Sequence, residues 1–309
     1  MSSADLHHAP APGAAGWTPG ELTSLVERLA PVLARRPEGV FARLALTAGA
    51  YVEFGASPVA LAENVPACTG MTLLLRKAFS EVWPAVNGDG RPEPNPDDPP
   101  RMRNLVKLFE DGAARAGIPA EAAPHVAVSW FDAPHWVNLL ITLLGRREFR
   151  DAMEPLAGLA EDAAELADRV PRAYWLGGLF AVLDDEPVVV LDPASGRGFR
   201  LTMSGVGDNF QLHTLLADRL IGDGEGGLLA GVRPEAAWVA AATDAPAEVA
   251  GKPIERRFRL FDATGEYVAP EGRPSEIARV EGARVLVIHP PNGSYQWGRA
   301  ASTRACARS

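Results

Sequence analysis

The spacing of apolar residues changes once along this chain, and that change limits the possible folds more than any other feature. Up to Asp184 apolar residues recur at helical spacing, whereas from Pro187 onward short β-branched runs alternate with turn residues. The sequence therefore predicts a mainly α protein with a C-terminal α+β portion that contains β-hairpins. We expect a disordered lead-in over 1–16, a helical domain over 17–185 and an α+β domain over 186–309.

The helical half begins with a clear start signal. Thr18 and Glu21 have the spacing of a capping box, and an apolar stripe with a period of 3.6 residues follows as far as Leu33. Several further helices follow after short connections, so neighbouring helices are expected to pack antiparallel. The pattern predicts an irregular layer of helical pairs that is α-solenoid-like, although no fixed internal repeat is present.

Proline and glycine mark the remaining boundaries. The Pro- and Gly-rich stretch 87–100 is expected to be a linker or a mobile surface loop, and a loop is favoured because helical periodicity resumes directly after it. Asp132 followed by Pro134 predicts the start of a new helix, with Asp132 as its N-cap. Other predicted elements are a helix from Leu73 to Val86, helical spacing over 148–170, a hairpin over 188–203, a helix over 208–221 and strands at 256–262, 266–269 and 285–289.

Composition excludes several classes of protein. The 30 Lys and Arg residues against 39 Asp and Glu give a formal charge of −9, which argues against a nucleic-acid or anionic-membrane partner. The two cysteines form no disulfide framework, and Cys68 is expected to lie in a loop. Because no signal peptide and no run of about 18 apolar residues is present, a cytoplasmic location is expected. The excess of Arg over Lys is typical of a GC-rich bacterial genome.

His125, Asp132 and His135 form the first candidate site. Asp132 and His135 are three residues apart and would share one face at a helix start, and convergent imidazoles and carboxylates are typical metal ligands. The three residues are therefore candidates for a metal site, with Asp132 and His135 also candidates for catalysis. The alternative is structural: Asp132 caps the helix and His135 lies beside tryptophans. No standard helical metal motif is present.

The second candidate site follows the hairpin. Gly205, Gly207, Asp208 and Asn209 form a glycine-containing turn at a helix start, where free amides can bind a ligand, and His213 follows one turn later. These four residues are candidate ligand-binding residues, and His213 is a candidate acid or base because its pKa lies near neutrality. The alternative is a buried, hydrogen-bonded brace between this helix and the hairpin.

These features leave three functional hypotheses. The first is a helical interaction module, a partner or regulatory protein that binds another protein or a peptide; the absence of standard catalytic motifs favours it. The alternative is an enzyme of specialised metabolism, which could depend on a metal ion. Its histidine-containing pocket would lie between the helical layer and the β-rich part. The third hypothesis is a sensor that binds a small molecule without chemistry. No specific cofactor is indicated.

Overall fold

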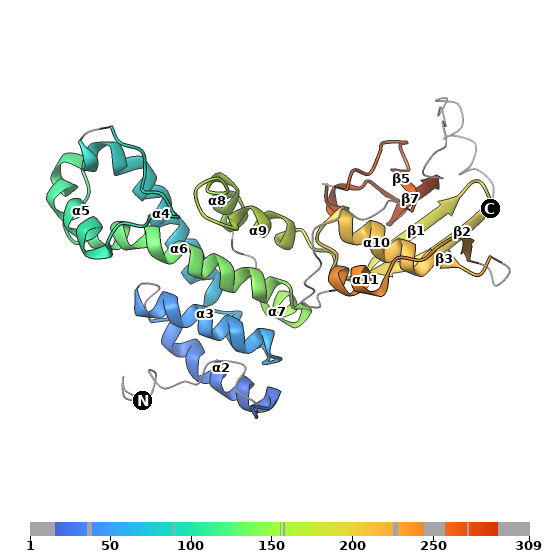
Figure 1. Ribbon diagram of the computed structural model, residues 1–309, viewed down its shortest axis with the longest axis horizontal. Coiled ribbons are helices and arrows are strands. Elements are labelled where there is room, and N and C mark those ends of the chain that lie inside the picture. Colours follow the sequence, from blue (N-terminus) through green and yellow to red (C-terminus); the bar gives the residue numbers. More distant parts are fainter. Residues whose placement is uncertain are drawn as a thin grey trace. The chain divides into compact units, whose positions relative to one another are not determined.

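The chain divides into two compact units, Met1–Phe180 (unit 1) and Ala181–Ser309 (unit 2). The computed structural model describes residues 16–35, 39–88, 90–154, 156, 158–224, 228–243, 257–270 and 272–289 (Figure 1). Unit 1 is helical and unit 2 contains a mixed sheet, so the prediction of a mainly α protein with a C-terminal α+β portion is confirmed. A solenoid arrangement is not confirmed. The predicted lead-in before Gly16 lies outside the described residues.

Unit 1 is organised around one long, apolar helix, α6. This helix packs against α3, α4, α5, α7 and α9, and Trp136 and Leu140 on it are fully buried. Because apolar residues occupy most of its surface, α6 can be covered on several sides at once. The elements of unit 1 are α2 (Pro19–Leu33), α3 (Val40–Glu53), η1 (Val59–Leu61), α4 (Val65–Asn87), α5 (Met102–Ala116), α6 (Ala123–Leu144), α7 (Arg147–Ala152), α8 (Leu159–Glu165) and α9 (Ala173–Phe180).

The start of α2 confirms the predicted capping box. The backbone N–H of Glu21 donates to Thr18 Oγ1 at 3.3 Å, and the Thr18 N–H donates to Glu21 Oε2 at 2.8 Å. These bonds satisfy amides that would otherwise lack partners at the helix start.

The predicted helix start at Asp132 is wrong, because α6 continues through Pro134 without a break. A proline inside a helix removes one backbone hydrogen bond and typically costs about 3 kcal/mol. Here the burial of apolar side chains on both sides of it, such as Trp130 and Trp136, offsets that cost. Asp132 is not an N-cap, since its carboxylate accepts a hydrogen bond from the Gly39 amide at 2.6 Å and thereby ties α6 to the start of α3.

Two other helix boundaries differ from the predictions. The segment 148–170 forms two short helices, α7 and α8. Met153 is extended after α7, and Gly158 adopts a positive φ of 85° at the N-cap of α8. The helix predicted from Leu73 begins at Val65, so Cys68 lies within α4 and not in a loop. Burial raises the pKa of the Cys68 thiol, which makes it a poor nucleophile.

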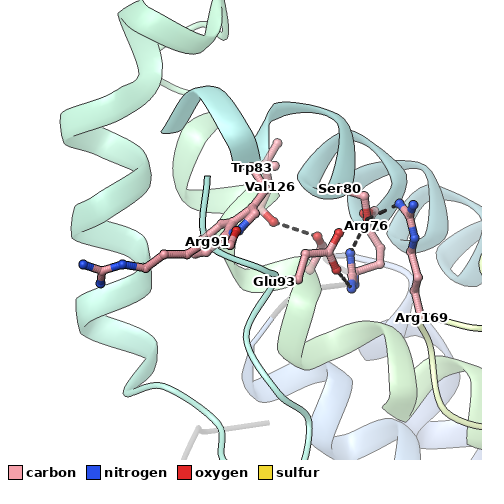
Figure 2. A network of polar contacts seen from close by, with 8 residues as sticks. Arg76, Ser80, Trp83, Arg91, Glu93, Val126 and Arg169 are labelled. Carbon is pink, nitrogen blue, oxygen red and sulfur yellow. Dashed lines mark hydrogen bonds and ion pairs between the residues drawn. The ribbon is translucent and has the colours of Figure 1, made fainter. Parts of the chain in front are cut away.

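The Pro-rich loop is fastened to α4 rather than free in solution (Figure 2). The Arg76 guanidinium, only 2% exposed, pairs with Glu93 at 2.6 Å, and Trp83 Nε1 donates to the Arg91 carbonyl at 2.8 Å. Arg169, which follows α8, approaches the other Glu93 oxygen at 3.9 Å. The loop itself is mostly exposed, so these polar anchors hold it more than apolar burial does.

Unit 2 is built on a sheet with the strand order β2-β1-β7-β5, and β6 also pairs with β7. The β1–β2 hairpin is antiparallel, as predicted, whereas β1 and β7 pair in parallel from Val188↔Arg284 to Leu191↔Val287. Figure 1 shows α10 against this sheet, and apolar residues of α10 join Val190 and Ile288 in the core. The elements of unit 2 are β1 (Glu186–Asp192), β2 (Arg197–Met203), α10 (Asn209–Leu220), β3 (Ile221–Gly222), β4 (Leu229–Ala230), α11 (Ala236–Ala242), β5 (Arg259–Asp262), η2 (Pro274–Glu276), β6 (Arg279–Val280) and β7 (Ala283–His289).

The predicted strand at 266–269 is wrong. Within it Tyr267 makes an isolated bridge to Phe261, and the segment otherwise folds back beside β5 after a turn. Asp262 organises this turn, because its Oδ1 accepts from the amides of Thr264 and Glu266. Backbone hydrogen bonds join Glu266 and Val268 to β5, but no regular strand forms. Of the strand predicted at 256–262, residues 259–262 form β5, and Arg256 lies outside the described residues.

Candidate functional site

A cavity of about 450 Å³ lies in unit 2 at the carboxyl ends of β1 and β7. Because these strands are parallel, Asp192 at the end of β1 and His289 at the end of β7 reach the same edge of the sheet. The carboxyl edge of parallel strands is a common place for ligands, and this volume suits a small organic molecule. The lining comprises Asp192, Ala194, Ser195, Arg197, Ile221, Gly224, Leu228, Leu229, Ala230, Arg257, Phe258, Ile288 and His289.

Asp192 directs its carboxylate into its own turn. Its oxygens accept hydrogen bonds from the Ala194 amide at 3.1 Å, the Ser195 amide at 3.2 Å and the Ser195 hydroxyl at 2.5 Å. The Asp-Pro-Ala-Ser turn forms because this side chain satisfies the backbone locally. Ser195 therefore stabilises the turn, and its hydroxyl donates to a carboxylate rather than to an imidazole.

Arginine supplies the positive charge of the cavity. Arg197 begins β2 and donates from Nη1 to the Leu228 carbonyl at 2.6 Å and from Nη2 to the Gly224 carbonyl at 3.0 Å. It thus holds Gly224 and Leu228 against the hairpin while keeping its charge at the cavity. Arg257, just before β5, adds a second guanidinium. The lining thus contains two arginines and one carboxylate, so its positive charge favours a negatively charged ligand.

His289 is a buried ionisable group of the cavity, with 4% of its surface exposed. Its ring packs edge-on against Phe261 on β5, with 5.1 Å between ring centroids. Burial, and then the positive charge of Arg259, lower the pKa of His289, while Asp192 acts in the opposite direction. The imidazole is therefore neutral at pH 7 and can both donate and accept a hydrogen bond.

The rest of the lining is apolar. Ile221 and Leu229 come from β3 and β4, and Phe258 and Ile288 come from the sheet core. An apolar wall beside two guanidinium groups can bind a molecule that combines a hydrocarbon or aromatic body with an anionic group.

The first predicted site lies in α6 of unit 1. His125 is exposed, Asp132 is buried on the Gly39 amide, and His135 Nδ1 lies 2.8 Å from the Phe131 carbonyl. Among the residues that the structure describes, no group of three or more His, Cys, Asp or Glu side chains could hold a metal ion. The predicted metal site and the catalytic role of His135 and Asp132 therefore gain no support from this geometry.

We expect Asp132→Ala to lower the free energy of unfolding by about 1–2 kcal/mol, because the Gly39 amide loses a charged acceptor in a partly buried site. Urea denaturation followed by tryptophan fluorescence measures this loss. Glu121→Ala, an exposed acid just before α6, is the matched control and should change stability by less than about 0.5 kcal/mol. An equal, small effect of both substitutions would contradict the bracing role.

The second predicted site lies around the start of α10 in unit 2. Asp208 is the N-cap, accepting from the Gln211 amide at 2.8 Å, and the Gly207 amide donates to Gln211 Oε1 at 2.8 Å. The Gly205 amide donates to the Leu183 carbonyl at 3.1 Å. These turn residues are thus engaged in local hydrogen bonds, and none of them lines the cavity.

The buried side chains of this second set brace α10 against the segment that follows β5. Asn209 Nδ2 donates to the Ala269 carbonyl at 2.8 Å, and His213 Nε2 lies 3.3 Å from the Val268 carbonyl. The structure brings Asp208, Asn209 and His213 together on α10, whereas His125, Asp132 and His135 belong to unit 1.

Sequence reasoning did not select Asp192 or His289 as site residues. Each is the polar residue that ends a buried, β-branched strand, and that position was the available signal. This position indicates a shared site only if β1 and β7 are known to pair in parallel, and about 90 residues separate these two strands.

No protein-family model matches this chain, and comparison with the curated proteins and with the solved structures found no match either. Among the described helices, none is long and apolar enough to cross a membrane.

Proposed function

We propose that unit 2 binds a small amphipathic organic anion in the cavity at the carboxyl ends of β1 and β7. The observation that carries the proposal is the charge of the lining. Arg197 and Arg257 line the cavity together with one carboxylate, that of Asp192, which already accepts three hydrogen bonds from its own turn. This arrangement supports the hypothesis of a small-molecule sensor among the three drawn from the sequence.

The apolar part of the lining sets the ligand class. A phosphate or sulfate ion would leave Leu228, Leu229 and Ala230 in contact with water, whereas an acid with a hydrocarbon or aromatic body would cover them. A carboxylate or sulfonate head group can accept hydrogen bonds from a guanidinium in a bidentate manner.

Titration calorimetry on the full chain tests this proposal. Octanoate and 1-heptanesulfonate are the anionic probes, and octylamine and inorganic phosphate are the controls. For probes of about ten non-hydrogen atoms we expect dissociation constants of about 0.1–1 mM, with both controls at least about tenfold weaker. Binding of octylamine as tight as that of octanoate, or no binding of either anion, would contradict the proposal.

A second candidate function is protein binding by unit 1, as the interaction-module hypothesis expects. Three large apolar side chains, Trp17, Phe54 and Val59, are exposed around one junction. The junction joins the start of α2 to the end of α3, because the Ser57 amide donates to Thr23 Oγ1 at 2.9 Å. Grouped exposed apolar residues are typical of a surface that binds the apolar face of a partner.

Affinity capture with matched variants tests this second function. A specific partner should be lost on Phe54→Asp and retained on Leu74→Asp, which alters an equally exposed apolar residue on α4. Equal retention of the captured protein by both variants would exclude a role for the junction.

A further inference from the structure

We infer that the cavity of unit 2 takes up one proton together with its anionic ligand, and that His289 holds this proton. The inference rests on the proposed function and adds the regulation of the same site. It follows from the charges that surround His289, first without and then with an anion in the cavity.

Without a ligand, burial and then the positive charge of Arg259 lower the pKa of His289 and favour the neutral imidazole. From β5, Arg259 places a positive charge near the ring, and Phe261 covers it with an apolar edge. At the cavity, Arg197 and Arg257 add two further positive charges. Against them, the end of β1 contributes the single carboxylate of Asp192, whose oxygens are held by the amides and hydroxyl of its own turn.

An anion in the cavity changes this balance. It lies against the same wall as His289, and a negative charge within about 4–6 Å favours the imidazolium. The pKa of His289 therefore rises on binding from its lowered value in the free protein. Protonated His289 in turn donates a charge-assisted hydrogen bond to the anion, and this bond is stronger than the one that the neutral ring can donate.

The sign of the pH dependence follows by linkage. Above the pKa of the complex, His289 is neutral in both states and affinity does not depend on its titration. As the pH falls from there to the pKa of the free protein, each binding event takes up a proton, and affinity rises by at most about tenfold per pH unit. Below the lower pKa the ring is protonated in both states, and the affinity levels off.

The test is calorimetry of the full chain with 1-heptanesulfonate, whose head group does not titrate near neutrality. Titrations at pH 6.5 in two buffers with different heats of ionisation give the number of protons taken up. We expect a value between zero and one for the wild type, and affinity that increases between pH 8.5 and pH 5.5. His289→Asn should bind with an affinity that does not change between pH 8.5 and pH 5.5, and with no proton uptake.

His125→Asn is the matched control, because it removes an exposed histidine of unit 1, and it should show wild-type uptake. If His289→Asn does not fold, the NMR titration of the wild-type histidine rings with and without the probe reports the same pKa change. Binding of the probe without proton uptake, or unchanged uptake in His289→Asn, would overturn the inference while leaving the proposed function intact. No binding of the probe at any pH would overturn both.

Discussion

Glu93→Gln is expected to lower the free energy of unfolding of unit 1 by about 3 kcal/mol. The substitution removes the negative charge that pairs with Arg76 at 2.6 Å, and Arg76 is almost fully buried (Figure 2). A buried guanidinium without its partner costs about 3–5 kcal/mol, and we place this pair at the lower end because Glu93 is partly exposed. Urea denaturation followed by tryptophan fluorescence measures the loss.

Two further variants distinguish the contribution of the ion pair to stability from that of the rest of the loop. Asp98→Asn removes an exposed charge of the same loop and should change stability by less than about 0.5 kcal/mol. Arg76→Met combined with Glu93→Gln should recover most of the loss, because an apolar side chain then replaces the unpaired charge. A loss below about 0.5 kcal/mol in Glu93→Gln would show that the pair does not hold the loop.

Arg257→Ala is expected to weaken the binding of octanoate about 10–100-fold. Hydrogen bonds to charged groups contribute about 1.5–3 kcal/mol, and Arg257 supplies one of the two guanidinium groups of the cavity. Calorimetry gives the affinity, and an unchanged urea midpoint shows that the variant remains folded. Arg257→Lys should recover part of the loss, because the charge returns without the planar fork.

The control for this prediction is Arg200→Ala, which removes an exposed arginine of β2 that does not line the cavity. Both variants lower the net charge of unit 2 equally, so a general electrostatic effect would weaken binding equally. A specific role of Arg257 predicts a large loss of octanoate affinity in Arg257→Ala and little change in Arg200→Ala.

The sequence predicted those features that depend on neighbouring residues. The capping box at Thr18, the helix that starts near Asp208 and the β1–β2 hairpin all follow from interactions between residues that are close in the chain. Such elements form because each local choice agrees with the structure around it.

The features that the sequence did not predict depend on contacts between distant segments. Asp132 has the local signature of an N-cap, yet its partner is the amide of Gly39, and packing carries α6 through Pro134. Likewise Asp192 and His289 meet at one edge because β1 pairs in parallel with β7, which no local pattern specifies. The cavity was therefore not predictable from periodicity, although the polar residue that ends each of its strands was visible.

A crystal structure of the full chain with 8-bromooctanoate tests directly whether an anion binds at the carboxyl ends of β1 and β7. We expect a bromine anomalous peak against the apolar lining formed by Leu228 and Leu229, with the carboxylate within hydrogen-bonding distance of Arg197 or Arg257. A ligand bound only elsewhere in the protein, or one in the cavity with its carboxylate turned away from both arginines, would contradict it.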